Sequence, residues 1–401
     1  MAARDDARVF KALNGFKIEL PSWGFADTGT RFGKFFQPAA AVDLEDKLHD
    51  AGLVHRLTGA CPTVAVHVLW DFEPGTDPQK IARLARKYGT RIGAINPNVF
   101  QHQCYKLGSF CSPDRKARTT ALNHTLDSIE IGKVVKSKFL SMWLADGTNY
   151  PGQDSISRRW DDLKTAFRKI HNAMPRGMTL LVEYKPFEPA FYHTDIADWG
   201  MAYLLAKYAG RNAKVLVDTG HHLPGCNIEQ IVTLLLGEKM LGGFHFNDRK
   251  YADDDLTIGS IDPYAVFRIF DQIEQHIFDT GKNPKLAYMI DQSHNIKPKL
   301  EAMIQTVMTA QDLYAKAVIV DRRALAPAQK KGDIVTAERI LRTAFETDVR
   351  PMVARWRRQQ GLASDPIQKL RNSGIVNKLA TERTAKRKGL GIGDRSAISA
   401  F

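Results

Sequence analysis

Eight short apolar runs recur between residues 15 and 294 of this 401-residue chain, and longer amphipathic stretches separate them. Each run is rich in β-branched or aromatic side chains, which is typical of strands buried on both faces. The runs occupy residues 15–23, 63–70, 91–100, 137–146, 179–187, 214–222, 241–249 and 285–294. Eight strand–helix units in continuous alternation predict an α/β fold, and they favour a closed (β/α)8 barrel, the TIM barrel, over an open doubly wound sheet.

The stretches between the runs have the end signals of helices. The segment 77–89 opens with Asp77 and Pro78 and closes on a glycine. This is the expected order of an N-cap, a first-turn proline and a residue that ends the helix. The segments 227–240 and 262–281 carry signals of the same kind.

One long loop interrupts the repeat after the first predicted strand. Residues 24–42 contain four phenylalanines, which are costly on a surface unless something covers them. We therefore expect Phe32, Phe35 or Phe36 to be buried by a neighbouring subunit, where one of them completes that subunit's pocket.

From about residue 320 the chain is helical, basic and strandless. We expect a barrel domain at residues 1–320 and a helical C-terminal extension at residues 321–401, with amphipathic stretches at 334–360 and 365–386. Residues 327–401 hold 16 Lys and Arg against 7 Asp and Glu, and so supply most of the net charge of +13. The barrel is then nearly neutral, which argues against a nucleic-acid-binding surface on it.

The cysteines and the apolar content point to a soluble, cytoplasmic protein. The four cysteines form no CxxC pair and are too sparse for a disulfide scaffold, so we expect reduced thiols. The first residues have no apolar signal core, and no stretch approaches the roughly 18 apolar residues of a membrane span.

Polar residues follow the apolar part of the last four runs. In a (β/α)8 barrel the carboxyl ends of the strands surround one mouth, so these side chains should meet there. They are Glu183, Lys185, Asp218, His221, His245 and Asp291, and the run that contains His245 leads into the acidic segment Asp253–Asp255. So many acids cannot share one mouth without cations, and carboxylates with imidazole suit Mn²⁺, Mg²⁺ or Co²⁺.

The spacing divides these residues into two predicted metal sites. The first consists of four side chains from four adjacent strands: Glu183, Asp218, His245 and Asp291. The second consists of Asp218, His221, Asp253 and Asp255, with Asp218 bridging both ions. Asp253 and Asp255 point the same way in an extended segment, whereas Asp254 points outward. The acidic segment is thus predicted to reach over the mouth to the second ion.

The motifs VEYKPFEP, VDTGHHLPG, GGFHFNDRKYADDDL and MIDQSHN together resemble the xylose-isomerase-like barrel superfamily, and within it the bacterial L-rhamnose isomerases of broad specificity. The resemblance covers roughly residues 15–320. It implies a tetrameric aldose–ketose isomerase with two divalent ions and with a loop of a partner subunit near the active site. We expect Mn²⁺ as the preferred ion. Lys185 resembles the lysine that contacts the substrate oxygen at C1, and His67 resembles the residue that assists sugar ring opening.

The sequence also differs from xylose isomerase proper, which has Glu at the position of Asp218 and Asp at that of His245. These departures favour the rhamnose-isomerase branch and hence conversion of L-rhamnose to L-rhamnulose. Trp70, Phe100 and Trp143 could form an apolar wall for the sugar's C–H face and methyl group. Lys185 and His221 are further predicted substrate contacts, and Asp253 and Asp255 are predicted to take part in the proton transfer together with Lys185 and His67.

Three other functions are compatible with parts of this pattern. A ketose 3-epimerase of the same superfamily would use one ion and two opposed glutamates, but Asp291 stands at one of those positions. A metal-dependent nuclease would fit the basic charge, but it needs more histidines at the strand ends. A sugar-binding protein without catalysis is the third alternative, because a fold does not fix a function.

Overall fold

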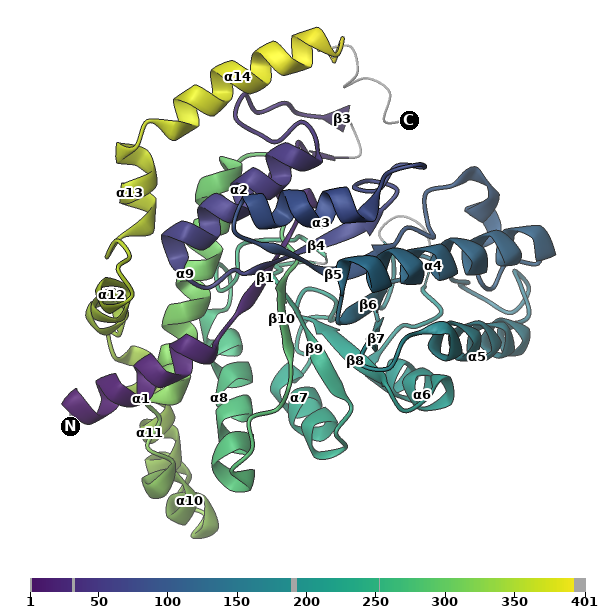
Figure 1. Ribbon diagram of the computed structural model, residues 1–401. Coiled ribbons are helices and arrows are strands. Elements are labelled where there is room, and N and C mark those ends of the chain that lie inside the picture. Colours follow the sequence, from purple (N-terminus) through teal and green to yellow (C-terminus); the bar gives the residue numbers. More distant parts are fainter. Residues whose placement is uncertain (1, 31–32, 189–192, 252, 393–401) are drawn as a thin grey trace.

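The computed structural model describes residues 2–30, 33–188, 193–251 and 253–392 (Figure 1). Eight parallel strands close into a barrel in the order β1-β10-β9-β8-β7-β6-β5-β4. They are β1 (Ile18–Pro21), β4 (Thr63–Val68), β5 (Arg91–Pro97), β6 (Phe139–Met142), β7 (Thr179–Glu183), β8 (Ala213–Asp218), β9 (Leu241–Phe246) and β10 (Ala287–Ile290). Seven of these strands fall inside predicted runs and β8 begins one residue before its run, at Ala213, so the predicted (β/α)8 barrel is confirmed.

Helices follow the strands and form the outer layer of the barrel (Figure 1). They are α2 (Leu44–Thr58), α3 (Pro78–Lys87), α4 (Arg115–Val135), α5 (Ile156–Ala173), α6 (Trp199–Ala209), α7 (Ile228–Gly237), α8 (Pro263–Thr280) and α9 (Lys299–Val318). The predicted N-caps are present, because Asp77, Asn227 and Asp262 each accept a hydrogen bond from a backbone N–H of the first turn. Gly89 follows α3 with φ of +84°, as a residue just beyond a helix often does.

One helix, one 3-10 turn and a pair of short strands near the N-terminus are not among the predicted elements. Helix α1 (Ala2–Gly15) precedes the barrel, and the small antiparallel pair β2 (Gly29–Thr30) and β3 (Gly33–Lys34) lies within the predicted loop 24–42. The same loop begins with a 3-10 turn, η1 (Trp23–Phe25). The described part of the segment after β1 therefore contains short regular elements, although the sequence predicts a loop there.

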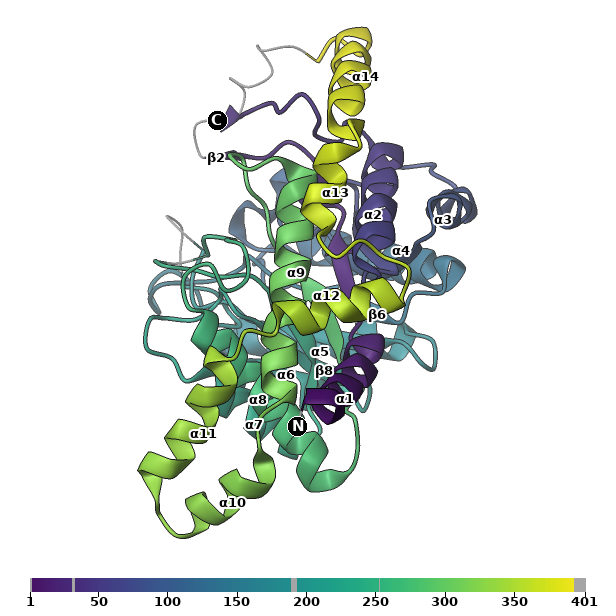
Figure 2. The ribbon, with the colours of Figure 1, turned by 90° about the vertical axis from the view of Figure 1, so that its left-hand side faces the viewer.

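The C-terminal helices run along one side of the barrel, where α11, α12 and α13 contact α9 (Figure 2). They are α10 (Arg322–Lys330), α11 (Ile334–Glu346), α12 (Arg350–Gln359), α13 (Pro366–Asn372) and α14 (Ile375–Gly389). Each of the two predicted amphipathic stretches is broken once, since Pro351 opens α12 and Gly374 takes a left-handed conformation between α13 and α14. The division of the chain into two domains at residue 320 stays a prediction.

Helix α14 is tied to the barrel by buried arginines. Arg383 pairs with Asp50 of α2 at 2.7 Å, and both side chains are buried. Arg387 pairs with Asp27 at 2.7 Å and donates to the carbonyl oxygens of Pro38 and Ala40. The extension thus holds the segment that follows β1, which we call the β1 loop (residues 24–42).

Removing the buried partner of Asp50 should destabilise the protein. For Arg383→Ala we expect the free energy of unfolding to fall by about 3 kcal/mol, because the buried Asp50 carboxylate would lose its arginine partner and keep, among the described residues, only the 3.1 Å contact with Nδ1 of His49. Lys378→Ala is the matched control, since the Lys378–Glu382 pair lies on the exposed face of the same helix at 3.8 Å and should contribute less than about 1 kcal/mol. Urea unfolding followed by circular dichroism measures both, and equal losses in the two variants would contradict the expectation.

Candidate metal centre and active-site cavity

Four predicted ligands meet at the carboxyl ends of β7 to β10. Glu183 ends β7, Asp218 ends β8, His245 is on β9 and Asp291 directly follows β10. One potential ligand atom from each lies within 4.8 Å of those of the others. The parallel register explains the convergence, since Asp218 and Met289 are both Cα partners of His245. We call these four residues the quartet.

The chemistry of the quartet fits a hard divalent cation. Burial raises the pKa of Asp218 to about 7, and the neighbouring carboxylates of Glu183 and Asp291 add to the rise. Burial alone would lower the pKa of His245, but Glu183, Asp291 and Asp218 raise it to about 9. Neither ring nitrogen of His245 makes a hydrogen bond to the described residues. Buried carboxylates and an uncommitted imidazole are a donor set that a cation would neutralise and satisfy.

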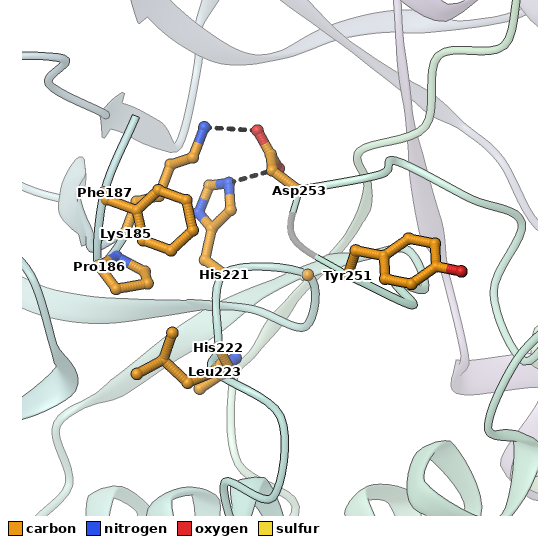
Figure 3. A pocket seen from close by; sticks show the side chains of 9 residues that line it. Lys185, Pro186, Phe187, His221, His222, Leu223, Tyr251 and Asp253 are labelled. Atoms are coloured by element: carbon orange, nitrogen blue, oxygen red, sulfur yellow. Dashed lines mark hydrogen bonds and ion pairs between the residues drawn. The ribbon is translucent and has the colours of Figure 1, made fainter. Parts of the chain in front are cut away.

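The four residues of the second predicted site are less tightly gathered. His221 Nε2 lies 3.0 Å from Asp253 and 3.9 Å from Asp218. Asp253 also accepts a hydrogen bond of 2.5 Å from Lys185, so its two oxygens are shared between a lysine and a histidine (Figure 3). Asp253 and Asp255 both line one cavity, and Asp255 has a left-handed backbone conformation, with φ of +46°. Metal ligation by this group stays a prediction.

The backbone fixes the orientation of His221. Its Nδ1 lies 3.0 Å from the carbonyl oxygen of Tyr184, which can only accept a hydrogen bond. Nδ1 therefore carries the proton, and Nε2 faces Asp253 and Asp218. The Tyr184 hydroxyl lies 2.6 Å from Nε2 of His222, which secures the segment behind the site. This orientation directs Nε2 toward the carboxylates of the second predicted site, as expected of the ligand nitrogen of a histidine.

Lys185 is held between two carboxylates. Its ammonium donates to Asp253 and, at 2.8 Å, to Glu188. Although burial lowers the pKa of Lys185, Asp253 and Glu188 outweigh it and raise that pKa above its ordinary value. Lys185 is thus a fixed positive charge at the edge of the cavity, 5.2 Å from the centre of the Trp143 ring.

A cavity of about 290 Å³ joins the predicted site residues. Its lining includes Trp23, His67, Trp70, Asn96, Phe100, Ser141, Trp143, Glu183, Lys185, Glu188, His221, Asp253, Asp255, Asp291 and Ser293. Among the predicted residues, Asp218 and His245 lie behind this lining, in contact with Glu183 and Asp291 as parts of the quartet. The structure therefore brings all predicted site residues to one place.

The three predicted wall residues form a continuous aromatic surface with His67. The ring centres of Trp70 and Phe100 are 6.1 Å apart, and those of Phe100 and Trp143 are 4.9 Å apart. His67 packs against Trp70 at 4.1 Å. Burial lowers the pKa of His67 to about 3, so its ring is neutral at physiological pH.

Sequence reasoning missed several residues of the cavity. Trp23 donates from its indole nitrogen to Asp291 at 2.9 Å, a contact between positions 268 residues apart. Glu188, Asn96, Ser141 and Ser293 also line the cavity. Glu188 stands within the quoted motif VEYKPFEP, three residues after Lys185, so its position could have been noted. No local sequence signal marks Ser141 or Trp23.

The phenylalanines of the β1 loop have different environments. Phe25 is fully buried, Phe36 is half-buried with the Arg387 guanidinium 5.9 Å from its ring centre, and Phe35 is 54% exposed. Phe32 lies outside the described residues. Coverage of this loop by a neighbouring subunit stays a prediction. In the part of the chain that the structure describes, no helix is both long and apolar enough to cross a membrane.

Comparisons with known proteins agree with this architecture. Residues 63–285 match the family of xylose isomerase-like TIM barrels. A probable sugar isomerase of Mesorhizobium japonicum and another of Rhizobium meliloti are each 40% identical over 381 residues, which cover 94% of this chain and 88% of the relative. A solved structure of an L-ribulose 3-epimerase superposes with a TM-score of 0.51 at 14% identity, covering 80% of this chain and 97% of that one, and shows the fold alone. By its match over more than half its length and by these two relatives, the chain belongs to the xylose isomerase-like TIM barrel family.

Proposed function

We propose that this protein is a metal-dependent aldose–ketose isomerase that converts L-rhamnose to L-rhamnulose and accepts related aldoses more slowly. The observation that carries the proposal is that the quartet, through Glu183 and Asp291, and the Lys185–Asp253 pair border one cavity of about 290 Å³. That volume suits a single small sugar, and the two relatives that share most of this chain's length are named probable sugar isomerases.

Two divalent ions, Mn²⁺ or alternatively Co²⁺ or Mg²⁺, are proposed to bind each subunit. Glu183, Asp218, His245 and Asp291 would hold one, and Asp218, His221, Asp253 and Asp255 the other. When bound, the ions would stabilise negative charge that develops on the substrate oxygens.

The side chains of this chain supply the remaining parts of the reaction. Isomerisation moves hydrogen from C2 to C1 and a hydroxyl proton from the oxygen at C2 to the oxygen at C1, so that C1 is reduced and C2 is oxidised. Lys185 is proposed to donate a hydrogen bond to the oxygen at C1, which is supported by its buried, charged ammonium held by Asp253 and Glu188. Asp253 and Asp255 are the proposed acceptors of the hydroxyl proton. Neutral His67 is proposed to assist ring opening, because its Nδ1 faces no partner among the described residues.

The aromatic wall and the oligomer complete the proposal. Trp70, Phe100 and Trp143 would cover the C–H face and the methyl group of the sugar, in the way that aromatic rings often do. We further propose a cytoplasmic homotetramer in which the β1 loop contacts the neighbouring subunit, with no nucleic-acid partner and no membrane association.

A panel of sugars tests the function. We expect metal-loaded protein to isomerise L-rhamnose fastest, with slower turnover of aldoses that share its configuration at C2 and C3, because one methyl against an apolar wall is worth only about 1–3 kcal/mol. Products are separated by chromatography, chelator-treated protein is the control, and bound metal is counted by mass spectrometry.

The same panel separates the alternatives. Epimerisation at C3 without any aldose product, together with one ion per chain, would replace the isomerase by a ketose 3-epimerase. Preference for another aldose would change the substrate only. Full metal loading without turnover of any sugar would identify a binding protein.

A further inference from the structure

Three buried polar atoms on the β4–β6 side of the cavity have no hydrogen-bond partner among the described residues. They are Nδ1 of His67, Oγ of Ser141 and Nε1 of Trp143, and all three residues line the cavity. Ser141 is 2% exposed. A buried polar group without a partner costs about as much as a lost hydrogen bond, and in native proteins it commonly marks a place where a ligand or water binds.

The strand register places Ser141 at the same level as two other polar residues. His67 and Asn96 are Cα partners between β4 and β5, and Ile95 and Leu140 are partners between β5 and β6, so Ser141 stands beside Asn96. Trp70, Phe100 and Trp143 follow these three positions along the chain and lie nearer the mouth. The cavity therefore has a polar layer beneath its aromatic wall.

The chemistry of this layer suits a neutral hydroxyl group. A serine hydroxyl both donates and accepts, as a sugar hydroxyl does, and Asn96 is fixed by the hydrogen bond from its Nδ2 to the Val66 carbonyl oxygen. The lysine that lines the cavity, Lys185, lies just beyond the end of β7, close to the quartet residue Glu183. An anionic ligand group would thus be drawn toward Lys185, whereas the β4–β6 layer offers neutral hydrogen-bonding groups.

We propose that Ser141, with Asn96 beside it, binds one hydroxyl of the substrate's polyol chain on the part remote from the reacting carbons, and is a specificity-determining residue. The identity of the reacting end rests on the proposed function, but the binding itself does not. Because a site built to pair a hydroxyl leaves its own group unpaired with an analogue that lacks it, Ser141 selects among sugars by the presence of that hydroxyl.

Binding of sugar alcohols tests this without turnover, since alditols have no carbonyl group to isomerise. Titration calorimetry with Mn²⁺-loaded protein would compare L-rhamnitol with its analogues that lack the hydroxyl at C3, C4 or C5. For the wild type we expect one analogue to bind about 10-fold more weakly than L-rhamnitol. In Ser141→Ala, the affinity for L-rhamnitol should fall by a similar factor. L-rhamnitol and that one analogue should then bind the variant equally well. Ser128→Ala is the matched control, because the Ser128 hydroxyl is buried in α4 and donates to the His124 carbonyl oxygen at 2.7 Å.

The possible outcomes separate this inference from the proposed function. Unchanged binding in Ser141→Ala, equal weakening of all alditols, or no alditol binding by the wild type would each overturn the role of Ser141. If the panel of sugars yields no isomerisation and the alditol pattern appears, the proposed function fails while the hydroxyl subsite stands. If isomerisation occurs and the variant binds every alditol as the wild type does, the hydroxyl subsite fails while the proposed function stands.

Discussion

Replacing Asp218 with asparagine is expected to lower kcat by ~10³-fold or more and to weaken the binding of both proposed ions. Asp218 is fully buried, belongs to the quartet and lies 3.9 Å from Nε2 of His221, and it is the carboxylate that we propose to serve both ions. Losing several kcal/mol of charge stabilisation in the transition state corresponds to a rate loss of this order. Steady-state kinetics and metal counting on the purified variant provide the two measurements.

Two comparisons make the Asp218 result specific. Asp127→Asn makes the same chemical change at an exposed position of α4 and should leave activity and metal content unchanged. His221→Ala should deplete mainly the second ion, because His221 is outside the quartet. Full occupancy of both sites in Asp218→Asn would contradict the bridging role, and equal loss of both ions from His221→Ala would contradict the division into two sites.

Lys185→Met is expected to lower kcat/KM by roughly 10²- to 10³-fold while both ions stay bound. The substitution removes the buried positive charge that we propose to stabilise developing charge on the substrate, an effect for which a loss of this size is typical. The retained metal distinguishes it from Asp218→Asn, since Lys185 is a donor to Asp253 and is itself no ligand.

Further variants separate the charge of Lys185 from its surroundings. Lys116→Met, at an exposed position of α4, is the matched control and should behave as the wild type. Glu188→Gln should have a smaller effect than Lys185→Met, because Asp253 still holds the ammonium when one of its two carboxylate partners is neutral. A wild-type kcat/KM in Lys185→Met would show that Lys185 has no part in the proposed reaction.

The barrel and the quartet could be predicted because both follow from local patterns. Each buried strand is a short apolar run, and the residue at its end is fixed by the sequence next to it, as in the runs that lead into Glu183 and Asp218. Closure of the sheet then brings neighbouring strand ends together without further information.

The parts that could not be predicted depend on contacts between distant positions. Trp23 reaches Asp291 only because β1 is hydrogen-bonded to β10 in the closed barrel. Whether the Ser141 hydroxyl has a hydrogen-bond partner depends on residues that are its neighbours in space. The sequence around a serine in an apolar run does not reveal this. The order of the β1 loop likewise depends on Arg387, 360 positions after Asp27.

The attachment of α14 also has a consequence for how the molecule is assembled. Barrel closure pairs Ile18 with Tyr288, and the arginine of α14 reaches Asp50 across 333 positions. Contacts between such distant residues form late in folding, because the entropy of closing the intervening chain must be overcome first. The pairs Arg383–Asp50 and Arg387–Asp27 therefore form only after α14 has been synthesised, whereas β1 can pair with β4 before that. The indole of Trp23 can join Asp291 only after β10 has been synthesised, so a nascent chain completes the quartet and this contact of the cavity at the same stage.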